Sequence, residues 1–331
     1  METVEKQREI EALVSNIGQL APTADDIEAW SARAKAGDVE AAKCVVAAMI
    51  RVAAVDPGAT MAVLDAITRG TLGREIAGIE TPADQTAMLA NLAKPDQLTA
   101  AFWGPFWSFI NNRTEGLGGD EVTAMVASLG ANVHEGFTAL AETASTAHPG
   151  AAGAATRALP PKLTLDTLSK LPDGSLGNEF YRLIVDNDFN LEVIDRKDIG
   201  YDDTAPALRY LNLRILQMHD VWHLVGGYRT TILQEVGISA FTLAQFNHNY
   251  SAILIATAAL SALKNSMDAY GLAAQIISEG WLHGRTTPSF MGIEWENEWH
   301  LPISEIRARH GIKPFASIFP ADLIEQIQKA A

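Results

Sequence analysis

The chain of 331 residues is long enough for about two domains of ordinary size or for one large domain. Hydrophobic residues make up 48% and charged residues 20%, a composition that supports a buried core and excludes a chain that is disordered throughout. Acidic side chains outnumber basic ones by 40 to 25, and the resulting net charge of −15 argues against nucleic acid as the main partner.

The single cysteine, Cys44, cannot form an internal disulfide, which is typical of a protein from a reducing compartment. The first residues mix acidic and basic side chains without an apolar segment, so they match neither a secretory signal nor an Arg-rich transit peptide. We therefore expect a cytoplasmic protein, with peripheral contact to the inner membrane left open. The longest apolar run, Ser251–Leu263, is shorter than the roughly 18 to 20 residues of a membrane span and is predicted to be a buried core helix.

Alanine-rich segments with apolar residues three and four positions apart predict helices along most of the chain, as at Val39–Ala54 and Asp120–Ala144. Only Leu191–Arg196 has the alternation expected of a strand. Residues that favour helix starts or turns punctuate these segments at Thr23, Asp56-Pro57-Gly58, Asp84, Gly118-Gly119, Asp120 and Gly226-Gly227. The predicted fold class is all-α, a multi-helix bundle.

Small residues, glycine and proline concentrate at His148–Leu163, a composition typical of a linker. We place a boundary there, between a helical N-terminal region (residues 1–160) and a helical core (residues 161–331). Just upstream, Phe102–Phe109 carries five aromatic residues around Gly104-Pro105 and is predicted to be too broken for one regular helix. These aromatic residues either form a satellite core or cap, or expose a surface for an apolar ligand, a membrane or a partner.

Two histidines, His219 and His223, stand four residues apart, which places both imidazoles on one face of a helix, about 6 Å apart at Cβ and able to hold one ion. Asp220 is rotated by about 100° from His219, so it would join the same ion from the flank of that face. A buried aspartate beside two imidazoles favours a cation, which offsets the cost of removing the carboxylate from water.

The glycines at Gly226-Gly227 are expected to end this helix, and Thr230 or Thr231 to cap the next one, which brings Glu235 back toward the histidines. The pattern H-D-x-x-H, eleven residues, then E thus predicts a metal site between two helices. Zinc is the first choice, with iron, manganese and magnesium as alternatives, because mixed nitrogen and oxygen ligands select weakly among these metals. The competing interpretation is a pair of core histidines without a metal, and a peptidase is disfavoured because Asp220 stands where a zinc protease has glutamate.

The motif resembles that of coenzyme Q biosynthesis protein four, the Coq-four family, whose hallmark is H-D-x-x-H-x(11)-E. Blocks on both sides are similar to the same family, upstream at Leu171–Asn187 and downstream at Ser278–Arg285 and Trp295–Ile312. Val55–Ile67 resembles an early block of the family more weakly, and residues 81–161 look like an insertion relative to its short members. Gln234 and Ser239 depart from the residues that are usual near the motif glutamate.

The resemblance implies an all-α fold, a divalent metal held by His219, Asp220, His223 and Glu235, and a pocket for an isoprenoid tail. It also implies a role in ubiquinone synthesis, in which the C1 carboxyl of a polyprenylated benzoate is replaced by hydroxyl, and association with other enzymes of quinone biosynthesis. Self-association is left open. The four motif residues would then serve catalysis as well as metal binding, with a lipid-binding or scaffold protein that holds a structural metal as the alternative.

Further polar residues are candidates for the substrate site. Arg229 and Arg285 are predicted to meet a carboxylate or phosphate of the ligand, and Tyr181 to donate a hydrogen bond into the site. Each of the three has a structural alternative, as a capping, solvated or packing residue. We expect His248, His283 and His300 to be structural or surface residues, because none has ligand spacing of its own. Finally, Glu279 and Glu296 are candidates for ion pairs with Arg285 or Arg307 that would fix the C-terminal helices.

Overall fold

The computed structural model describes residues 2–74, 98–111, 136–158, 161–191 and 205–330, together with residues 129 and 133. Within these ranges the chain is helical, with one isolated bridge between Ser175 and Pro302 and no strand, so the predicted all-α fold is confirmed. The α-helices are α1 (Glu2–Leu20), α2 (Ala24–Lys35), α3 (Val39–Ala54), α4 (Thr60–Leu72), α6 (Ala100–Asn111), α8 (Phe137–Ala147), α9 (Leu165–Leu168), α10 (Leu176–Asp186), α11 (Pro206–Gly226), α12 (Ile232–Phe246), α13 (Asn249–Asn265), α14 (Met267–Thr286), α15 (Ile303–His310) and α16 (Leu323–Ala330). Short 3-10 turns lie at Pro57–Ala59, Pro149–Ala151, Ala154–Thr156, Phe290–Gly292 and Trp295–Asn297.

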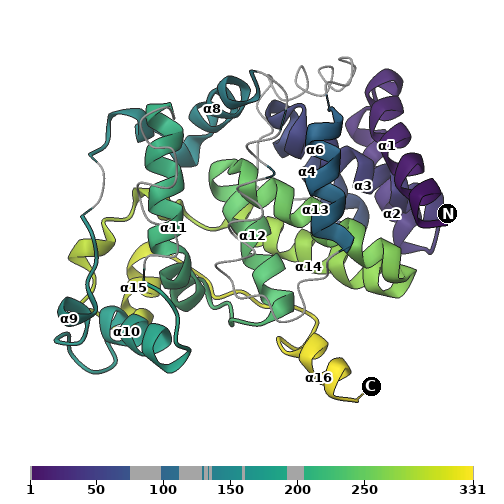
Figure 1. The fold of residues 1–331 in the computed structure, drawn as a ribbon. Coiled ribbons are helices and arrows are strands. Elements are labelled where there is room, and N and C mark those ends of the chain that lie inside the picture. Colours follow the sequence, from purple (N-terminus) through teal and green to yellow (C-terminus); the bar gives the residue numbers. More distant parts are fainter. Residues whose placement is uncertain are drawn as a thin grey trace.

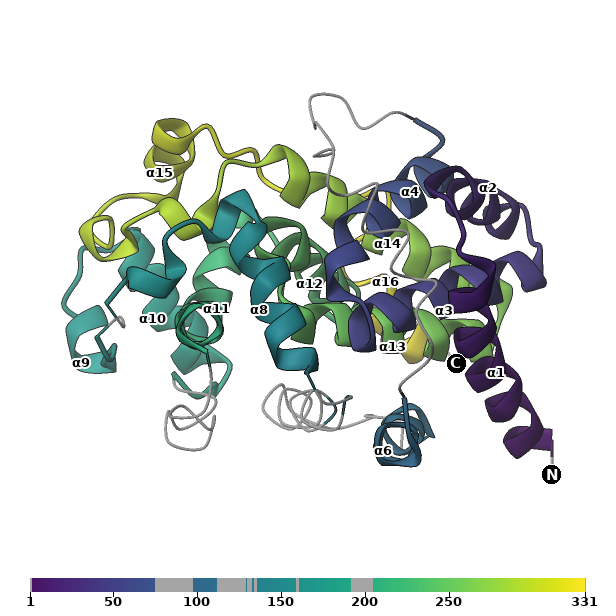
Figure 2. The same cartoon turned by 90° about the horizontal axis from the view of Figure 1, so that it is seen from above.

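The N-terminal helices α1 to α4 gather on one side of the molecule and pack against α13 and α14 (Figures 1 and 2). Helix α3 is apolar around almost its whole circumference and is correspondingly buried at every residue from Val45 to Ala54. The predicted start at Thr23 is confirmed, since Thr23 and Asp26 form a reciprocal capping box at α2. At α3 the carboxylate of Asp38, which the sequence analysis did not single out, accepts from the amide of Ala41.

Helices α12 and α14 cross with their backbones in contact. A Cβ atom placed on Gly280 would lie 2.1 Å from the carbonyl oxygen of Gly237, and one placed on Gly284 would lie 2.6 Å from that of Phe241. Only glycine permits so close an approach, so these residues fix α12 firmly on α14. The helix that carries Glu235 is thereby held along its middle and C-terminal turns.

A second core lies between α10, α11, α15 and the 3-10 turns that precede α15 (Figure 1). Trp222 and Trp295 are completely buried in it. The guanidinium of Arg307 donates hydrogen bonds of 2.8 Å to the carbonyl oxygens of Leu224 and Val225, which closes the C-terminal end of α11. The last turn of the helix that bears both histidines is therefore held from α15.

A buried group of three side chains joins the N-terminal helices to α14. The carboxylate of Asp65 in α4 accepts two hydrogen bonds of 3.1 Å from Arg285 and one of 2.7 Å from the indole of Trp281. We call Asp65, Trp281 and Arg285 the Asp65 cluster. One hydrophobic core also runs from α1–α4 into α12–α14, so packing among the described residues crosses the division that we predicted near residue 160.

The aromatic segment Phe102–Phe109 corrects one prediction. It lies within the single α-helix α6, with Pro105 inside the helix, and not in a broken segment. Four aromatic side chains at helical spacing are at most 8% exposed and pack on one another: Phe102, Trp103, Phe106 and Trp107. Trp107 also donates to Glu11 of α1 and lies beneath the ammonium of Lys264 of α13. The four residues belong to the same hydrophobic core as α1–α4, and their burial offsets the roughly 3 kcal/mol that an internal proline costs a helix.

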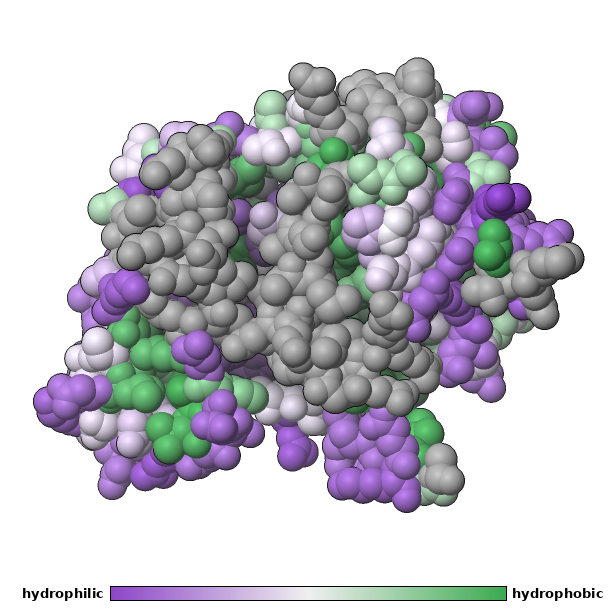
Figure 3. All heavy atoms as spheres, viewed as in Figure 1, coloured by the Kyte–Doolittle hydropathy of each residue, from purple (hydrophilic) through white to green (hydrophobic). Residues whose placement is uncertain are grey.

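Exposed apolar side chains gather in the region of α9 and α10, where Leu165, Val185 and Phe189 are 39 to 48% exposed (Figure 3).

In the described part of the chain, no single helix has the length and hydropathy of a membrane span. Only α3 and the segment Pro57–Leu72 pass such a test together, and these two bend by 119° at their junction. The predicted core helix Ser251–Leu263 is confirmed as part of α13, whereas most of the predicted strand Leu191–Arg196 lies outside the described residues.

Candidate metal centre

Helix α11 ends where the glycines predict. Gly227 adopts a left-handed conformation (φ 80°), and the amides of Gly227 and Tyr228 both donate to the carbonyl oxygen of His223. A Cβ atom at Gly227 would also lie 2.8 Å from the side chain of Pro314. Both the conformation and this close approach require glycine, so the chain turns sharply here. We call residues 227–231 the elbow between α11 and α12.

Helix α12 begins at Ile232, with Thr231 at its N-cap. The expected side-chain cap is wrong, because the hydroxyl of Thr231 donates instead to the carbonyl oxygen of Ala321. The amide of Ile232 is satisfied from elsewhere in the chain by a carboxylate oxygen of Glu325, at 2.9 Å. Glu235 lies in the first turn of α12, and its amide donates to the carbonyl oxygen of Thr231.

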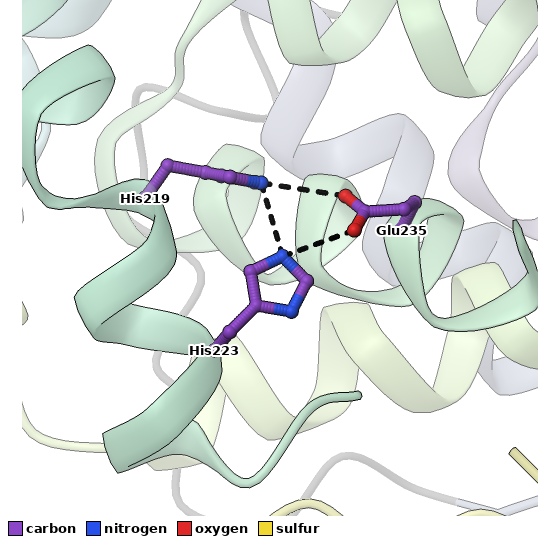
Figure 4. Close-up of side chains that lie close together, drawn as sticks. All are labelled: His219, His223 and Glu235. Atoms are coloured by element: carbon purple, nitrogen blue, oxygen red, sulfur yellow. Dashed lines mark hydrogen bonds and ion pairs between the residues drawn. The ribbon is translucent and has the colours of Figure 1, made fainter. Parts of the chain in front are cut away.

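The elbow brings His219, His223 and Glu235 together, with the three side chains pointing at a common centre (Figure 4). The two histidine Nε2 atoms are 3.1 Å apart, and the Glu235 carboxylate oxygens lie 3.4 Å from Nε2 of His219 and 3.3 Å from Nε2 of His223. We call these three residues the donor triad. Ligand bonds of about 2.0 to 2.2 Å give donor separations of about 2.8 to 3.6 Å in octahedral and tetrahedral sites, so the triad matches one face around a single ion.

The donor triad is closed on one side and accessible on the other. The side chain of His223 is 1% exposed, whereas those of His219 and Glu235 are 32% and 43% exposed. Burial raises the pKa of the Glu235 carboxyl, but the neighbouring His223 and His219 outweigh this effect and hold the pKa well below its usual range. Burial conversely lowers the pKa of His219, and its hydrogen bond to Glu235 together with the charges of Glu235 and Asp220 makes the net shift upward.

The chemistry of this donor set suits a divalent ion. Two imidazole nitrogens and a carboxylate are ligands that zinc, iron and manganese accept in proteins. Nδ1 of His223 is buried and has no hydrogen-bond partner among the described residues, whereas the second nitrogen of a metal-bound histidine usually donates to one. The fit therefore rests on the three converging donor atoms.

Comparison with known proteins shows a similarity over the region that contains this centre. Residues 156–316, just under half of the chain, match the family of coenzyme Q (ubiquinone) biosynthesis protein Coq4. The chain is similar to the Coq4 family over this region. The chain is 28% identical over 170 residues to the mitochondrial ubiquinone biosynthesis protein COQ4 homolog of Danio rerio and 26% identical over 159 residues to that of Mus musculus.

These two alignments cover 51% and 46% of this chain, which spans 59% and 55% of the length of the relatives. A crystal structure of a Nostoc punctiforme protein aligns with 66% of this chain and 98% of its own, at 27% identity and a TM-score of 0.49. The whole donor triad lies inside the Coq4 region, and the weaker resemblance at Val55–Ile67 lies before it.

Asp220 is the predicted ligand that the structure does not bring into the group. It follows His219 by one residue, a rotation of about 100° around the helix axis, and its carboxylate is not among the converging donor atoms; the residue is half-exposed. Its charge still helps to raise the pKa of His219. The group of converging donor atoms among the described residues therefore has three members, and Asp220 is not one of them.

The predicted substrate residues have different neighbours. Tyr181 packs against the second core. Arg229 is exposed on the elbow. The pKa of Asp322 is lowered chiefly by the hydrogen bonds that its carboxylate accepts, and the charge of Arg229 lowers it further. Arg285 belongs to the Asp65 cluster. The expected pairing of Glu279 and Glu296 with Arg285 or Arg307 is wrong.

The two glutamates have other partners. Glu296 pairs with Arg214 of α11 through both carboxylate oxygens, and Glu279 accepts from Gln275 and Ser317. The contacts with Arg214 and Ser317 join elements that lie far apart in sequence, so no local pattern could predict them, whereas Gln275 lies one turn before Glu279 in α14.

Two residues that the sequence did not single out as a pair adjoin the triad. Tyr228 lies with its ring 6.5 Å from that of His223, and its hydroxyl donates to Nδ1 of His283 at 2.7 Å. Nε2 of His283 donates to the carbonyl oxygen of Lys313, which fixes the tautomer of His283. Burial, with the charge of Glu279, raises the pKa of Tyr228, so this chain of hydrogen bonds is neutral and structural.

The remaining histidines have the structural or surface roles that we expect. His248 is buried and pairs with the hydroxyl of Ser251, and burial together with the charge of His219 lowers the pKa of His248 to about 3. His300 is exposed.

Proposed function

We propose that this chain takes part in ubiquinone biosynthesis and holds one divalent ion at His219, His223 and Glu235. The observation that carries the proposal is the convergence of these donors, all within 4.8 Å of one another, inside a region similar to the Coq4 family. Relatives that match this region are named for ubiquinone biosynthesis, and we extend that role to this chain by their likeness. Zinc is the first candidate, followed by iron, manganese and magnesium.

The accessible side of the donor triad supports catalysis. Zinc sites closed by four protein ligands are structural, whereas those with three protein ligands keep a position for water or substrate. Because Asp220 lies outside the group and both His219 and Glu235 are partly exposed, the three donors leave such a position. When bound, the ion supplies Lewis acidity toward the oxygen atoms of a substrate.

The substrate that we propose is a polyprenylated benzoate intermediate. Its ring carboxylate is anionic, and a net charge of −15 on the protein would repel it in the absence of a local cation. Replacing the C1 carboxyl by hydroxyl releases carbon dioxide and adds one oxygen atom to the ring carbon. This is a two-electron oxidation, for which we propose dioxygen as the external oxidant: dioxygen takes up the two electrons and two protons and leaves as hydrogen peroxide, while water supplies the new ring oxygen.

The chain's own residues would then bind and orient the substrate. We propose Arg229 and Tyr181 as contacts of the polar ring, and we assign Arg285 to the Asp65 cluster because its guanidinium is already paired. The apolar helices beside the triad would accommodate the prenyl tail, since lipid pockets are mostly hydrophobic with few polar groups. Other quinone-biosynthesis proteins, the surface of the inner membrane and a second copy of the chain are proposed partners.

A structural metal in a lipid-binding or scaffold protein is the second candidate. The observation that favours it is that the donors come from both helices, so one ion would also staple α11 to α12 across the elbow. In that case removing the ion would lower stability as much as it lowers function.

The test is quinone production in cells that lack their own copy of the gene. Wild-type protein should restore ubiquinone, and His219→Ala/His223→Ala at equal abundance should not. Normal ubiquinone with the double variant would refute the catalytic role. A melting temperature of the variant far below that of the wild type, alongside the lost quinone, would favour the structural metal.

A further inference from the structure

The segment that follows α15 lies across the elbow between the two ligand-bearing helices. We call residues 313–325 the strap. The Coq4 match ends at residue 316, so most of the strap lies beyond the matched region. In Figure 1 the strap is the yellow chain that runs from α15 beneath α12 to α16. The strap residues that contact the end of α11 lie within the match, whereas those that contact the start of α12 lie beyond it.

The first part of the strap holds the end of α11. The amide of Phe315 donates to the carbonyl oxygen of Gly226 at 2.7 Å, and the ring of Phe315 stacks on Tyr228 at 4.3 Å. Pro314 lies against Gly227 so closely that a larger residue there would collide with it. These contacts fix the start of the elbow, four residues after His223.

The last part of the strap holds the start of α12. Thr231 donates its hydroxyl to the carbonyl oxygen of Ala321 at 2.6 Å, so this N-cap side chain does not cap its own helix. Glu325 performs that role from outside, because its Oε1 atom accepts the amide of Ile232, one of the amides that lack a partner within the helix. A carboxylate at this position also interacts favourably with the positive end of the helix dipole.

These contacts determine where the triad carboxylate lies. Glu235 is three residues after Ile232, and its own amide is bonded to Thr231, so the two strap contacts fix the turn that presents Glu235. The histidines come from α11, and only the five residues of the elbow connect them to Glu235. A shift of the first turn of α12 would thus alter the separations of 3.3 and 3.4 Å between the carboxylate and the imidazoles.

We propose that Glu325 is a positioning residue for the metal site and that it acts by holding the helix turn that carries Glu235. Its carboxylate is not one of the converging donors and accepts the amide of Ile232 instead. This inference rests on the proposed metal site. It adds that a segment outside the Coq4 match sets the geometry of a centre within the match.

The experiment measures the affinity of the purified full chain for Zn²⁺ by competition with a chromophoric chelator. Three variants are compared with the wild type, together with the melting temperature of each metal-free protein. Glu325→Ala removes the cap, and Glu325→Gln keeps an oxygen that accepts the same hydrogen bond. Gln328→Ala is the matched control, since it alters an exposed residue of the same helix, α16.

Glu325→Ala should weaken zinc affinity roughly tenfold, the scale of effects for residues that orient a metal ligand. Glu325→Gln should recover most of that loss, and Gln328→Ala should match the wild type. Equal affinity in the wild type and Glu325→Ala would overturn the inference while leaving the metal site intact. Equal zinc affinity per folded molecule together with a lowered melting temperature would also overturn it, because Glu325 would then be structural alone. A wild type that binds no zinc would refute the proposed metal site itself.

Discussion

The Asp65 cluster and the donor triad are two polar groups on neighbouring helices, and they differ in completeness. In the Asp65 cluster the carboxylate accepts hydrogen bonds from a guanidinium and an indole, so its negative charge is balanced by the positive charge of Arg285. In the donor triad, two imidazoles and a carboxylate turn metal-ligand atoms toward one centre. A complete cluster stabilises a fold, whereas converging donors without a fixed cationic side chain are arranged for an ion.

Removing both imidazoles should have the largest effect on metal content and should leave the Asp65 cluster unchanged. His219→Ala/His223→Ala takes away two of the three donors, so we expect the metal content to fall from close to one ion per chain to background. The Asp65 cluster is untouched, and the metal-free double variant should stay helical. Elemental analysis and circular dichroism measure the two quantities. Background metal in the wild type after reconstitution with zinc, iron or manganese would make the histidines core residues.

Breaking the Asp65 cluster should produce the opposite pattern. Asp65→Ala leaves the guanidinium of Arg285, which is 12% exposed, without its carboxylate. Loss of one partner of a buried ion pair lowers the free energy of unfolding by about 3 to 5 kcal/mol. Urea denaturation measures this loss, and metal content per folded molecule should stay at the wild-type level. A comparable fall in metal content would show that the two groups are coupled through α14.

The difference between the two groups also indicates what a sequence can predict. The glycine elbow and the i, i+4 histidines depend on local geometry, and the structure bears out both. The partner of Arg285 is 220 residues away along the chain, so no local pattern could indicate it. The Glu325 cap likewise depends on how the chain returns to the elbow after 93 residues.

Two differences from the sequence predictions have physical causes. Asp220 lies outside the converging group, because neighbours on a helix are separated by about 100° around its axis. The break at Pro105 was expected from backbone rules alone, whereas the burial of four aromatic side chains decided the outcome. At Pro105 tertiary packing overrides the local backbone preference.

The donor triad should respond to pH in opposite senses with and without metal. In the metal-free protein the pKa of Glu235 is lowered, so its contribution to stability is present above the unfolded value near about 4.3 and is lost as pH falls. The pKa of His219 is raised, so its contribution is present below about 6.5 and is lost as pH rises through the folded value. The triad thus stabilises the metal-free chain most between about pH 4.5 and 6.5.

Metal binding requires neutral imidazoles, so zinc affinity should rise as pH increases through the titration of His219. We expect the increase in melting temperature on adding zinc to grow between about pH 6 and 8. His219→Ala/His223→Ala is the control and should show no zinc-dependent increase at either pH. An increase that is the same at both values would contradict proton competition at the triad.

The smallest expected effect concerns Asp220, and it tests the ligand count directly. Asp220→Asn removes a charge that helps to raise the pKa of His219 but no atom of the donor triad. Zinc affinity at neutral pH should therefore change less than about threefold, and near pH 6 it should increase slightly because protons compete less well for His219.

Glu235→Gln, which removes a triad donor charge, is the comparison and should weaken binding at least tenfold on the scale of altered metal-site residues. If Asp220→Asn weakened binding as much as Glu235→Gln, the aspartate would be a fourth ligand, and the site would be closed in the manner of a structural metal.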